Sequence, residues 1–534
     1  MIDIARIGSA PGGAPGPFRP EELLHAGAFD HPVSDLDVLE TNTSWIVLTG
    51  RYAYKIKRAV AFDFLDMRTL AQRRFLCEEE LRLNRRLAPD LYLAVVAITR
   101  GAQGLRVGGY GEAVEYAVRM RQFDRSQELS ALLDRAEVSA GEITAFAARL
   151  ARFHAAAARS GDTLGFVHTE HMRGAVLGNV AILLSHVDGE FEMPELASLA
   201  DWTHDCLDRS MPRLRRREQG GCIRECHGDL HARNIVRWGG DLVAFDCLEF
   251  DPKLRWIDVM NDVAFLFMDL AARGRRDLAF VFLNEYVRQT GDYEGIRLLP
   301  FYAVHRALVR AMVDALAAEQ DPRKRRDFAR RFQARIDIAV DFMRPRPPIL
   351  ILMHGPSGSG KSWLSERLAP LVGAVRIRSD VERKRLAGAA AGDDLYEPQF
   401  NARTYTHLRE CADNCLQAGM PTIVDAAFLR RGDRDSFMAL AARLAVPCVI
   451  LSCEAERNIL AERIAARARA GLDPSDADLA VLDGQLRTLE PLGADERPLV
   501  VALSTSDPRA AALAQAAISA RRDMVAADAP CRCP

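Results

Sequence analysis

Gly355-Pro356-Ser357-Gly358-Ser359-Gly360-Lys361-Ser362 decides the fold of the C-terminal part of this 534-residue chain. It follows the apolar run Ile349–Met353 and precedes a helix-like segment, Trp363–Leu368. Strand, glycine-rich loop and helix in this order predict a P-loop, whose backbone N–H groups and helix N-terminus surround a phosphate. We expect Lys361 to reach the β- and γ-phosphates of ATP and Ser362 to offer its hydroxyl to Mg²⁺. The wider nucleotide-binding set would be Gly355, Ser357, Gly358, Ser359, Gly360, Lys361 and Ser362.

A second motif lies far upstream. His227-Gly228-Asp229-Leu230-His231-Ala232-Arg233-Asn234 has the H-x-D-x-x-x-x-N spacing of a kinase catalytic loop. The strands Ile235–Trp238 and Leu242–Phe245, joined by Gly239-Gly240-Asp241, predict a tight hairpin that returns the chain and brings Asp246 beside Asn234. We expect Asp229 to accept the proton of the acceptor hydroxyl, and Asn234 and Asp246 to bind Mg²⁺. A turn capped by Asp and Asn is the structural alternative.

Kinase chemistry of this type also needs a strand lysine paired with a helical glutamate. Trp45–Thr49 and Tyr52–Lys57 predict a hairpin that carries the candidate Lys55. Lys57 lies on the same face of the strand and is an alternative. The helix expected at about Leu70–Leu87 carries Glu80 as the candidate partner, with Glu79 as an alternative. Lys55 and Glu80 are the candidates of the nucleotide site in this domain, with Glu80 as the ion-pair partner of Lys55.

Residues from about 30 to 345 resemble the aminoglycoside phosphotransferase family, which has a protein kinase-like fold. The resemblance rests on Glu40–Trp45, on Ala53–Lys57, on the catalytic loop and on Asp262–Leu266. The whole chain resembles a bacterial two-domain family in which such a domain precedes a P-loop kinase. The chain lacks the G-x-G-x-x-G loop of protein kinases, and the polar turn Thr41–Ser44 takes its place. The family resemblance implies ATP as the phosphoryl donor and leaves the acceptor open.

Residues from about 349 to 520 resemble small P-loop kinases such as gluconate kinase, chloramphenicol phosphotransferase and the kinase half of polynucleotide kinase. The resemblance implies that Asp380, after the strand Val375–Ser379, is the catalytic base; a helix N-cap is the alternative. It also implies an arginine-bearing lid near the end of the helix Glu454–Ala470, with Arg467 as the catalytic candidate and Arg463 as the alternative. Asp425 ends a predicted strand, Pro421–Asp425, and is a candidate Mg²⁺ ligand.

Length and composition fit two catalytic domains. The chain is too long for one hydrophobic core, and its charged fraction of 27% is that of an ordinary globular protein. A net charge of −2 favours neither nucleic acid nor anionic membranes as partners. Neither a secretory signal nor an apolar run of 18 residues is visible, and the 11 cysteines do not form zinc-like pairs, so we expect a cytoplasmic location.

The fold class expected is an α+β kinase-like domain followed by an α/β P-loop domain with a mainly parallel sheet. The predicted boundaries are a flexible segment at 1–29, the kinase-like domain at 30–343, a Pro/Arg linker at 344–348, the P-loop domain at 349–522 and a disordered tail at 523–534. The function expected is transfer of the γ-phosphoryl group of ATP to a hydroxyl of a small metabolite in each domain. The alternative is a P-loop ATPase or nucleotide-sugar kinase coupled to a kinase-like regulatory or binding domain.

Overall fold

The computed structural model of this chain describes residues 18–62, 65–102, 104–161, 167–187, 194–320, 325–344, 347–388, 397–470 and 478–528. It contains two compact units. The first is the chain up to Arg125 together with Ala244–Pro252, and the second is Ser126–Val243 together with Lys253 onward. Within the ranges given, none of the helices is both long enough and apolar enough to span a membrane.

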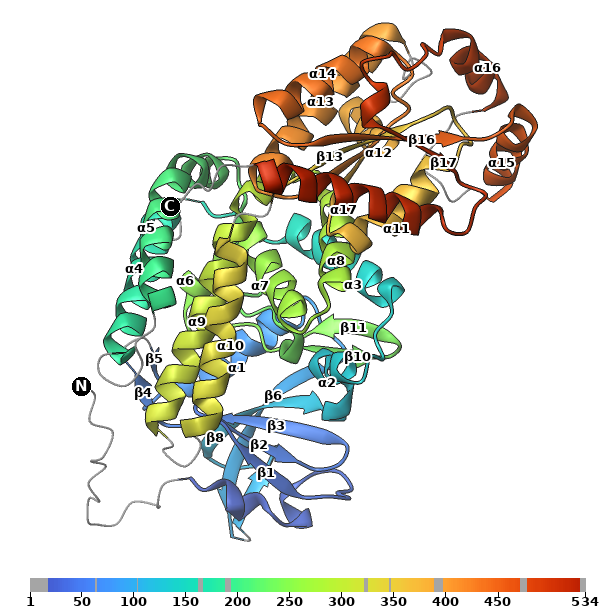
Figure 1. The fold of residues 1–534 in the computed structure, drawn as a ribbon. Coiled ribbons are helices and arrows are strands. Elements are labelled where there is room, and N and C mark those ends of the chain that lie inside the picture. The colour runs from blue at the N-terminus through green and yellow to red at the C-terminus, as the bar shows by residue number, and fades with distance from the viewer. Residues whose placement is uncertain are drawn as a thin grey trace. The chain divides into compact units, whose positions relative to one another are not determined.

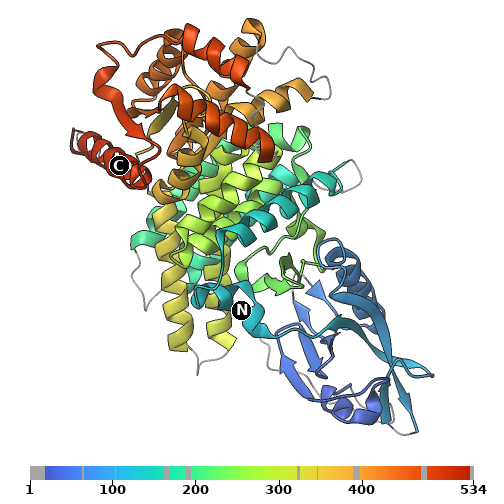
Figure 2. The ribbon, with the colours of Figure 1, turned by 90° about the vertical axis from the view of Figure 1, so that its right-hand side faces the viewer.

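The first unit is built on a six-stranded antiparallel sheet with the order β1-β2-β3-β8-β6-β7. Helix α1 (Leu70–Asn84) packs on this sheet against β8 and β6 (Figure 2). The helix begins at Thr69, whose side chain accepts a hydrogen bond from the backbone N–H of Gln72, while Gln72 caps Thr69 in return. The strands are β1 (Asp37–Glu40), β2 (Ser44–Leu48), β3 (Tyr52–Lys57), β6 (Tyr92–Gly101), β7 (Gly104–Val107) and β8 (Ala113–Arg121), with the small hairpin β4 (Ala61–Phe62) and β5 (Leu65–Asp66).

The start of the first unit differs from the prediction of a flexible segment at 1–29. Residues 1–17 lie outside the described residues, but the following residues form the short helices η1 (Pro20–Leu23) and η2 (Ala26–Ala28). Leu23 and Ala28 are fully buried in a hydrophobic cluster with strand residues of the sheet. Burial of these apolar side chains orders the segment, so the predicted boundary at residue 29 is wrong for residues 18–29.

The second unit begins with a helical region that carries the catalytic-loop motif. The motif lies between strand β9 (Ile223–Glu225) and the hairpin of β10 (Ile235–Trp238) and β11 (Asp241–Ala244), and its last three residues form η5 (Ala232–Asn234). The hairpin turn, Gly239-Gly240, has positive φ at both residues (60° and 89°), which is the geometry that glycine permits in a two-residue turn. The predicted hairpin is therefore present.

Long helices surround this motif. Helix α7 is buried along most of its length and packs against α8 and α9, and α9 and α10 form the long pair visible in Figure 1. The elements of this region are η3 (Arg125–Gln127), α2 (Leu129–Asp134), α3 (Ala140–Ala156), α4 (His168–Val187), α5 (Pro194–Gln219), α6 (Pro252–Arg255), β12 (Trp256–Asp258), α7 (Val259–Ala272), α8 (Arg276–Thr290), η6 (Gly295–Leu298), α9 (Leu299–Gln320) and α10 (Arg325–Met343).

The second unit continues into a five-stranded parallel sheet with the order β14-β15-β13-β16-β17. The central strand β13 is buried at all five positions, as expected for a strand covered by helices on both faces. The elements are β13 (Leu350–His354), α11 (Lys361–Val372), β14 (Val375–Arg378), α12 (Ser379–Ala387), α13 (Pro398–Gln417), β15 (Thr422–Asp425), α14 (Arg431–Arg443), β16 (Cys448–Glu454), α15 (Arg457–Ala470), α16 (Leu479–Thr488), η10 (Arg497–Leu499), β17 (Val500–Ser504) and α17 (Ala510–Asp528). The predicted fold class is confirmed.

Two predicted boundaries flank the P-loop domain, a tail at its end and a linker at its start. Helix α17 continues to Asp528, past the predicted start of a disordered tail at 523, while residues 529–534 lie outside the described residues. Of the predicted linker 344–348, residues 345 and 346 also lie outside them. The linker position falls inside the second compact unit, because the helical region and the P-loop sheet contact each other.

Helix α8 contacts the P-loop sheet through a small set of hydrogen bonds. The side chain of Asn284 donates to the backbone oxygen of Ala374 (2.9 Å) and accepts from the backbone N–H of Arg376 (2.7 Å). Just beyond the C-terminal end of α8, the Tyr293 hydroxyl donates to the fully buried carboxylate of Glu382 (3.3 Å). These contacts join residues that are about 90 positions apart along the chain.

A buried ion pair anchors α14 in the P-loop domain. The side chains of Arg434 and Glu496 are both 0% exposed and form two hydrogen bonds, of 2.6 and 3.0 Å. Burial favours the neutral carboxyl, but the Arg434 guanidinium holds the pKa of Glu496 below its ordinary value. We expect Arg434→Met to lower the free energy of unfolding by about 3–5 kcal/mol, because it removes both guanidinium hydrogen bonds of a buried carboxylate. Chemical denaturation checks this value.

The same helix supplies the control for this prediction. Arg443 pairs with Asp413 at 3.0 Å, but its side chain is 57% exposed. We expect Arg443→Met to change the free energy of unfolding by less than about 1 kcal/mol. Equal effects of the two substitutions would contradict the importance of the buried pair.

Candidate functional site

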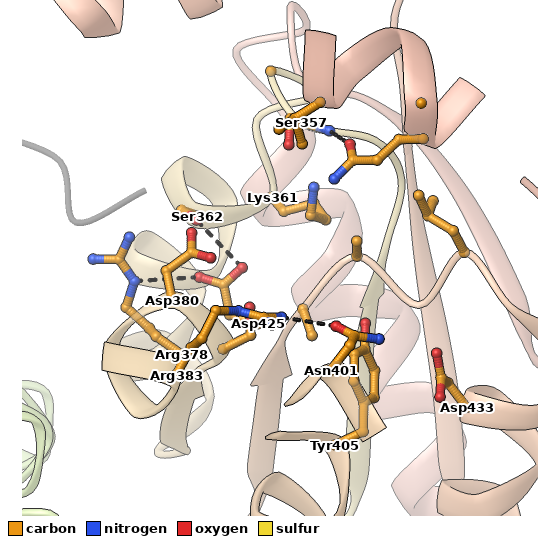
Figure 3. A pocket seen from close by; sticks show the side chains of 18 of the residues that line it. Ser357, Lys361, Ser362, Arg378, Asp380, Arg383, Asn401, Tyr405, Asp425 and Asp433 are labelled. Atoms are coloured by element: carbon orange, nitrogen blue, oxygen red, sulfur yellow. Dashed lines mark hydrogen bonds and ion pairs between the residues drawn. The ribbon is translucent and has the colours of Figure 1, made fainter. Parts of the chain in front are cut away.

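The P-loop residues line a cavity of about 530 Å³ at the carboxyl ends of the parallel strands. Ser357, Gly358, Gly360, Lys361 and Ser362 line it directly. Asp380 and Asp425, from the ends of two neighbouring strands, also line it, and Figure 3 shows Lys361, Asp380 and Asp425 turned toward the same cavity. The structure thus brings together the predicted phosphate-binding residues and both predicted carboxylates of this domain.

Two of the predicted nucleotide-binding residues shape the loop instead of lining the cavity. Gly355 has a φ of 134°, and a Cβ there would lie 2.5 Å from the Cys453 carbonyl oxygen. Ser359 is buried, and its backbone oxygen accepts a hydrogen bond from Thr505 (2.8 Å). Gly360, like Gly355, has no room for a side chain, since its φ is 86° and a Cβ would lie 2.5 Å from Thr505. The loop geometry therefore depends on glycine at these positions.

The lysine of the P-loop is folded back onto the loop. Lys361 Nζ donates to the backbone oxygen of Pro356 (2.8 Å) and lies 3.5 Å from Ser359 Oγ. Burial lowers the pKa of Lys361, and the carboxylate of Asp425 partly offsets this effect. A bound phosphate would replace the weak carbonyl contact by a charge-assisted one.

Asp425 and Ser362 form a pair of oxygen donors that suits Mg²⁺. Ser362 Oγ donates to Asp425 Oδ1 (3.3 Å), and Arg376 donates to Asp425 Oδ2 (2.8 Å). Although burial alone raises the pKa of Asp425, the guanidinium groups of Arg376 and Arg378 hold it below its ordinary value. Asp425 is therefore ionised, and a carboxylate beside a hydroxyl is a hard-oxygen donor set of the kind that Mg²⁺ prefers.

Asp380 lies in the first turn of α12. The N-cap of this helix is Arg378, so the structural alternative, in which Asp380 is only the N-cap, is not what the structure has. Arg383, one turn later, also lines the cavity and donates to Asn401 Oδ1 (2.9 Å). Asp380 therefore lines the cavity, and Figure 3 shows it close to Asp425.

Both candidate lid arginines line the cavity. Arg463 donates to Thr505 (2.8 Å) and contacts the backbone oxygen of Gly358 (3.4 Å), which ties α15 to the P-loop. Arg467, one turn later, lines the cavity as well. Asp473–Asp476 lie outside the described residues. The geometry leaves both arginines as candidates for binding the transferred phosphoryl group.

The catalytic-loop motif forms a compact hydrogen-bonded group in the second unit. Asn234 Nδ2 donates to Asp229 Oδ2 (2.9 Å) and to the Asp229 backbone oxygen (3.0 Å). His231 Nε2 lies 3.3 Å from Asp229 Oδ2. Burial raises the pKa of Asp229, but His231, Arg310 and His227 together lower it below its ordinary value. Asp229 is an ionised carboxylate held in place, as a proton acceptor must be.

The strand lysines lie in the first unit, and both contact Glu80. Lys55 Nζ is 2.8 Å from Glu80 Oε1 and 2.5 Å from Asp246 Oδ1. Lys57 Nζ contacts the other oxygen of Glu80 and also Glu249. Although burial lowers the pKa of Lys55, the carboxylates of Asp246 and Glu80 raise it well above its ordinary value. The sequence alternatives Lys55 and Lys57 are thus both partners of one glutamate, while Glu79 pairs with Arg82 on the helix surface.

Asp246 has an unusual backbone conformation. Its φ is 63°, in the left-handed region that residues other than glycine rarely adopt, and its N–H donates to the Tyr92 hydroxyl (3.1 Å). Such a conformation persists only where the surroundings impose it. The contact with Lys55 places Asp246 among the charged residues of the first unit.

Several contacts in these sites were not predicted from the sequence. Gln485 on α16 accepts a hydrogen bond from the Ser357 N–H (2.7 Å), Thr505 supports the P-loop, and Arg376 holds Asp425. Arg376 and Arg378 alternate along β14, and this pattern could have indicated two basic side chains on one face of the strand. Gln485 and Thr505 lie more than 120 residues from Ser357 and carry no local signal.

Comparisons with known proteins identify chains that are similar to this one. A family model described as "AAA domain" matches residues 350–492. The chain is 33% identical over 466 residues to "Uncharacterized protein Rv2004c" of Mycobacterium tuberculosis, which covers 85% of this chain and 91% of that protein. Among solved structures, it is similar to a gluconokinase from Sinorhizobium meliloti (24% identity, 35% of this chain and 99% of that one, TM-score 0.26). It is also similar to a choline/ethanolamine kinase family protein from Mesorhizobium loti (12% identity, 59% and 90%, TM-score 0.36).

Proposed function

From the premise that this chain belongs to the family of the mycobacterial protein Rv2004c and joins a kinase-like region to a P-loop domain, we propose that it is an ATP-dependent phosphotransferase with two active sites. Each site transfers the γ-phosphoryl group of ATP to a hydroxyl of a small metabolite. ATP and Mg²⁺ serve both sites, and neither nucleic acid nor membrane is a partner in this proposal. The proposed location is the cytoplasm.

One observation carries the proposal. A single cavity holds the P-loop residues Lys361 and Ser362 together with three carboxylates, those of Asp380, Asp425 and Asp433. Asp425 contacts the Ser362 hydroxyl, so one carboxylate belongs with the metal-binding group. Asp380, in the first turn of α12, is the carboxylate proposed to act on an acceptor. An ATP-binding module that performs no transfer needs only the carboxylate of the metal-binding group.

In the P-loop site each residue has a separate role in the proposed reaction. Asp380 accepts the proton of the acceptor hydroxyl as that oxygen forms a bond to the γ-phosphorus, and the bond from phosphorus to the bridging oxygen of ADP breaks. Lys361 and Arg467 bind the oxygens on which negative charge is spread. Mg²⁺, held by Ser362 and Asp425, would neutralise charge on the phosphates. The products are a phosphate ester, ADP and one proton.

In the kinase-like site the corresponding roles fall to the catalytic-loop residues. Asp229 accepts the hydroxyl proton, and Asn234 orients Asp229 through its amide N–H groups. The amide oxygen of Asn234 and the carboxylate of Asp246 are the donors proposed for Mg²⁺. Lys55, fixed by Glu80, is proposed to bind the nucleotide phosphates.

The experiment is transfer of label from γ-labelled ATP into a fractionated small-metabolite extract. The full-length protein is compared with the double variant Asp229→Asn/Lys361→Ala. We expect labelled phosphate esters with the wild type and none with the double variant. Release of labelled inorganic phosphate without any ester would contradict the proposal and favour the alternative, a P-loop ATPase coupled to a kinase-like binding domain.

A further inference from the structure

A second cavity, of about 460 Å³, lies in the helical region of the second unit beside the catalytic loop. Five elements form it: α2, the catalytic loop, α7, α9 and α10. Its charged lining consists of five arginines, three aspartates and one histidine: Arg233, Arg273, Arg310, Arg331 and Arg335, with Asp134, Asp269 and Asp314, and His231. The cavity is distinct from the P-loop site, because the two share no lining residue.

The three aspartates of this cavity are already engaged by its arginines. Asp134 pairs with Arg273 (3.0 Å), and Asp314 accepts a hydrogen bond from Arg331 (3.0 Å). Asp269 lies 3.7 Å from Arg273 and 3.8 Å from Arg335, and it also accepts from the Ala232 N–H (2.9 Å). The carboxylates of the cavity are therefore neutralised by groups within it.

Two of the five arginines of the cavity do not take part in this pairing. Within the part of the chain that the structure describes, neither Arg233 nor Arg310 makes an ion pair or a side-chain hydrogen bond. In addition, the donors Arg273 Nε and Arg335 Nε are buried without a hydrogen-bond partner there, as are His231 Nδ1 and the acceptor Asp314 Oδ2. Buried N–H groups without partners are costly. A cavity with surplus guanidinium charge and unsatisfied donors is suited to an anion with several oxygen atoms.

The cavity adjoins the proposed catalytic base. His231 lines the cavity, and its Nε2 lies 3.3 Å from Asp229 Oδ2. The charge of Arg310 also acts on the Asp229 carboxyl. An anionic group bound by the arginines would therefore lie near His231, the side chain that contacts Asp229.

We infer that this cavity is the acceptor site of the kinase-like domain and that it takes a hydroxylated small molecule bearing an anionic group, a phosphate or a carboxylate. The inference rests on the proposed function and adds the charge class of one substrate. We expect a cationic acceptor to be disfavoured, because five arginines line the cavity with only three aspartates, and each aspartate already pairs with an arginine.

The test is calorimetric binding of inorganic phosphate to the full-length protein, with Mg²⁺ and a non-hydrolysable ATP analogue present at saturation to fill both nucleotide sites. We expect Arg310→Gln to weaken one phosphate-binding event by about 10- to 100-fold, because a charge-assisted hydrogen bond is lost. Arg310→Lys, which keeps the charge, should lose less. Since Arg310 makes no ion pair or side-chain hydrogen bond within the described ranges, its replacement breaks no internal bond of this kind.

The matched control is Arg330→Gln on α10, because Arg330 is 81% exposed and does not line the cavity. The control should bind phosphate like the wild type. Identical binding by wild type and Arg310→Gln would overturn the inference, and so would competition between phosphate and the ATP analogue for the Arg310-dependent event, which would assign the cavity to the nucleotide. Both results would leave the labelled-transfer experiment unaffected, so failure of the inference and failure of the proposed function are distinguishable.

Two probe acceptors distinguish an acceptor that bears a phosphate from one that bears a carboxylate. Glycerol 3-phosphate and glycerate each carry free hydroxyl groups and one type of anionic group. Label from γ-labelled ATP that enters only the first supports a phosphate-bearing acceptor, and label that enters only the second supports a carboxylate-bearing one. Label that enters a cationic amino alcohol, independently of Arg310, would contradict the inference.

Discussion

Asp229→Asn is expected to reduce phosphoryl transfer by the kinase-like site by about 10²- to 10⁴-fold, the usual contribution of a general base. An amide has the shape of the carboxylate but cannot accept the hydroxyl proton. Asn234 donates a hydrogen bond to the backbone oxygen of residue 229, and the substitution leaves this hydrogen bond in place. The loss should therefore appear in kcat, with little change in the KM for ATP.

This first prediction is measured on an acceptor identified with labelled ATP, in steady-state kinetics of the full-length protein. Asp241→Asn is the matched control, because Asp241 is 58% exposed and pairs with Arg149 on the surface. Labelled esters produced by the P-loop site should persist in Asp229→Asn. A variant with unchanged kcat would remove Asp229 from the chemistry and leave it as a capping residue of the turn.

Lys361→Ala is expected to reduce transfer by the P-loop site by about 10²- to 10³-fold, the cost of removing one preorganised donor from a developing negative charge. Lys361 lies in the cavity and is held only by a backbone oxygen and a distant hydroxyl. No internal ion pair of this lysine appears among the described residues, so the fold should not depend on its charge. Products of the kinase-like site should be unaffected.

The measurement for this second prediction is again acceptor-dependent transfer, together with nucleotide binding by calorimetry. Lys361→Arg tests geometry, since a planar guanidinium keeps the charge but does not replace the compact ammonium group. Lys384→Ala, an exposed lysine on α12, is the control. If Lys361→Ala keeps full transfer activity, the P-loop domain is not one of the two kinases.

The sequence predicted those parts of both sites that depend on local backbone geometry. The P-loop, the Gly239-Gly240 hairpin and the strand that ends at Asp425 are all present where they were expected. Each depends on glycines or on a short apolar run, whose effects act within a few residues. Local patterns of this kind suffice for the fold class as well.

Tertiary contacts could not be predicted in the same way. Lys55 and Lys57 share a strand face, and the structure shows why the sequence did not separate them: both bind Glu80. The cluster of arginines at the second cavity comes from separate elements spread from the catalytic loop to α10, so no stretch of sequence shows their proximity. The flexible segment predicted at 1–29 includes Leu23, whose burial against the sheet depends on residues far along the chain.

The hydrogen bonds of Asn284 have a consequence for how the chain can be divided. Strand β14 is one of the two edge strands of the parallel sheet, and Asn284 bonds the Ala374 carbonyl just before it and the Arg376 N–H within it. A fragment beginning at residue 349 would expose this edge as a template for pairing with a second copy. The helical region therefore covers part of this edge, and we expect a fragment cut at the proline-rich junction to associate with itself more readily than the full-length protein.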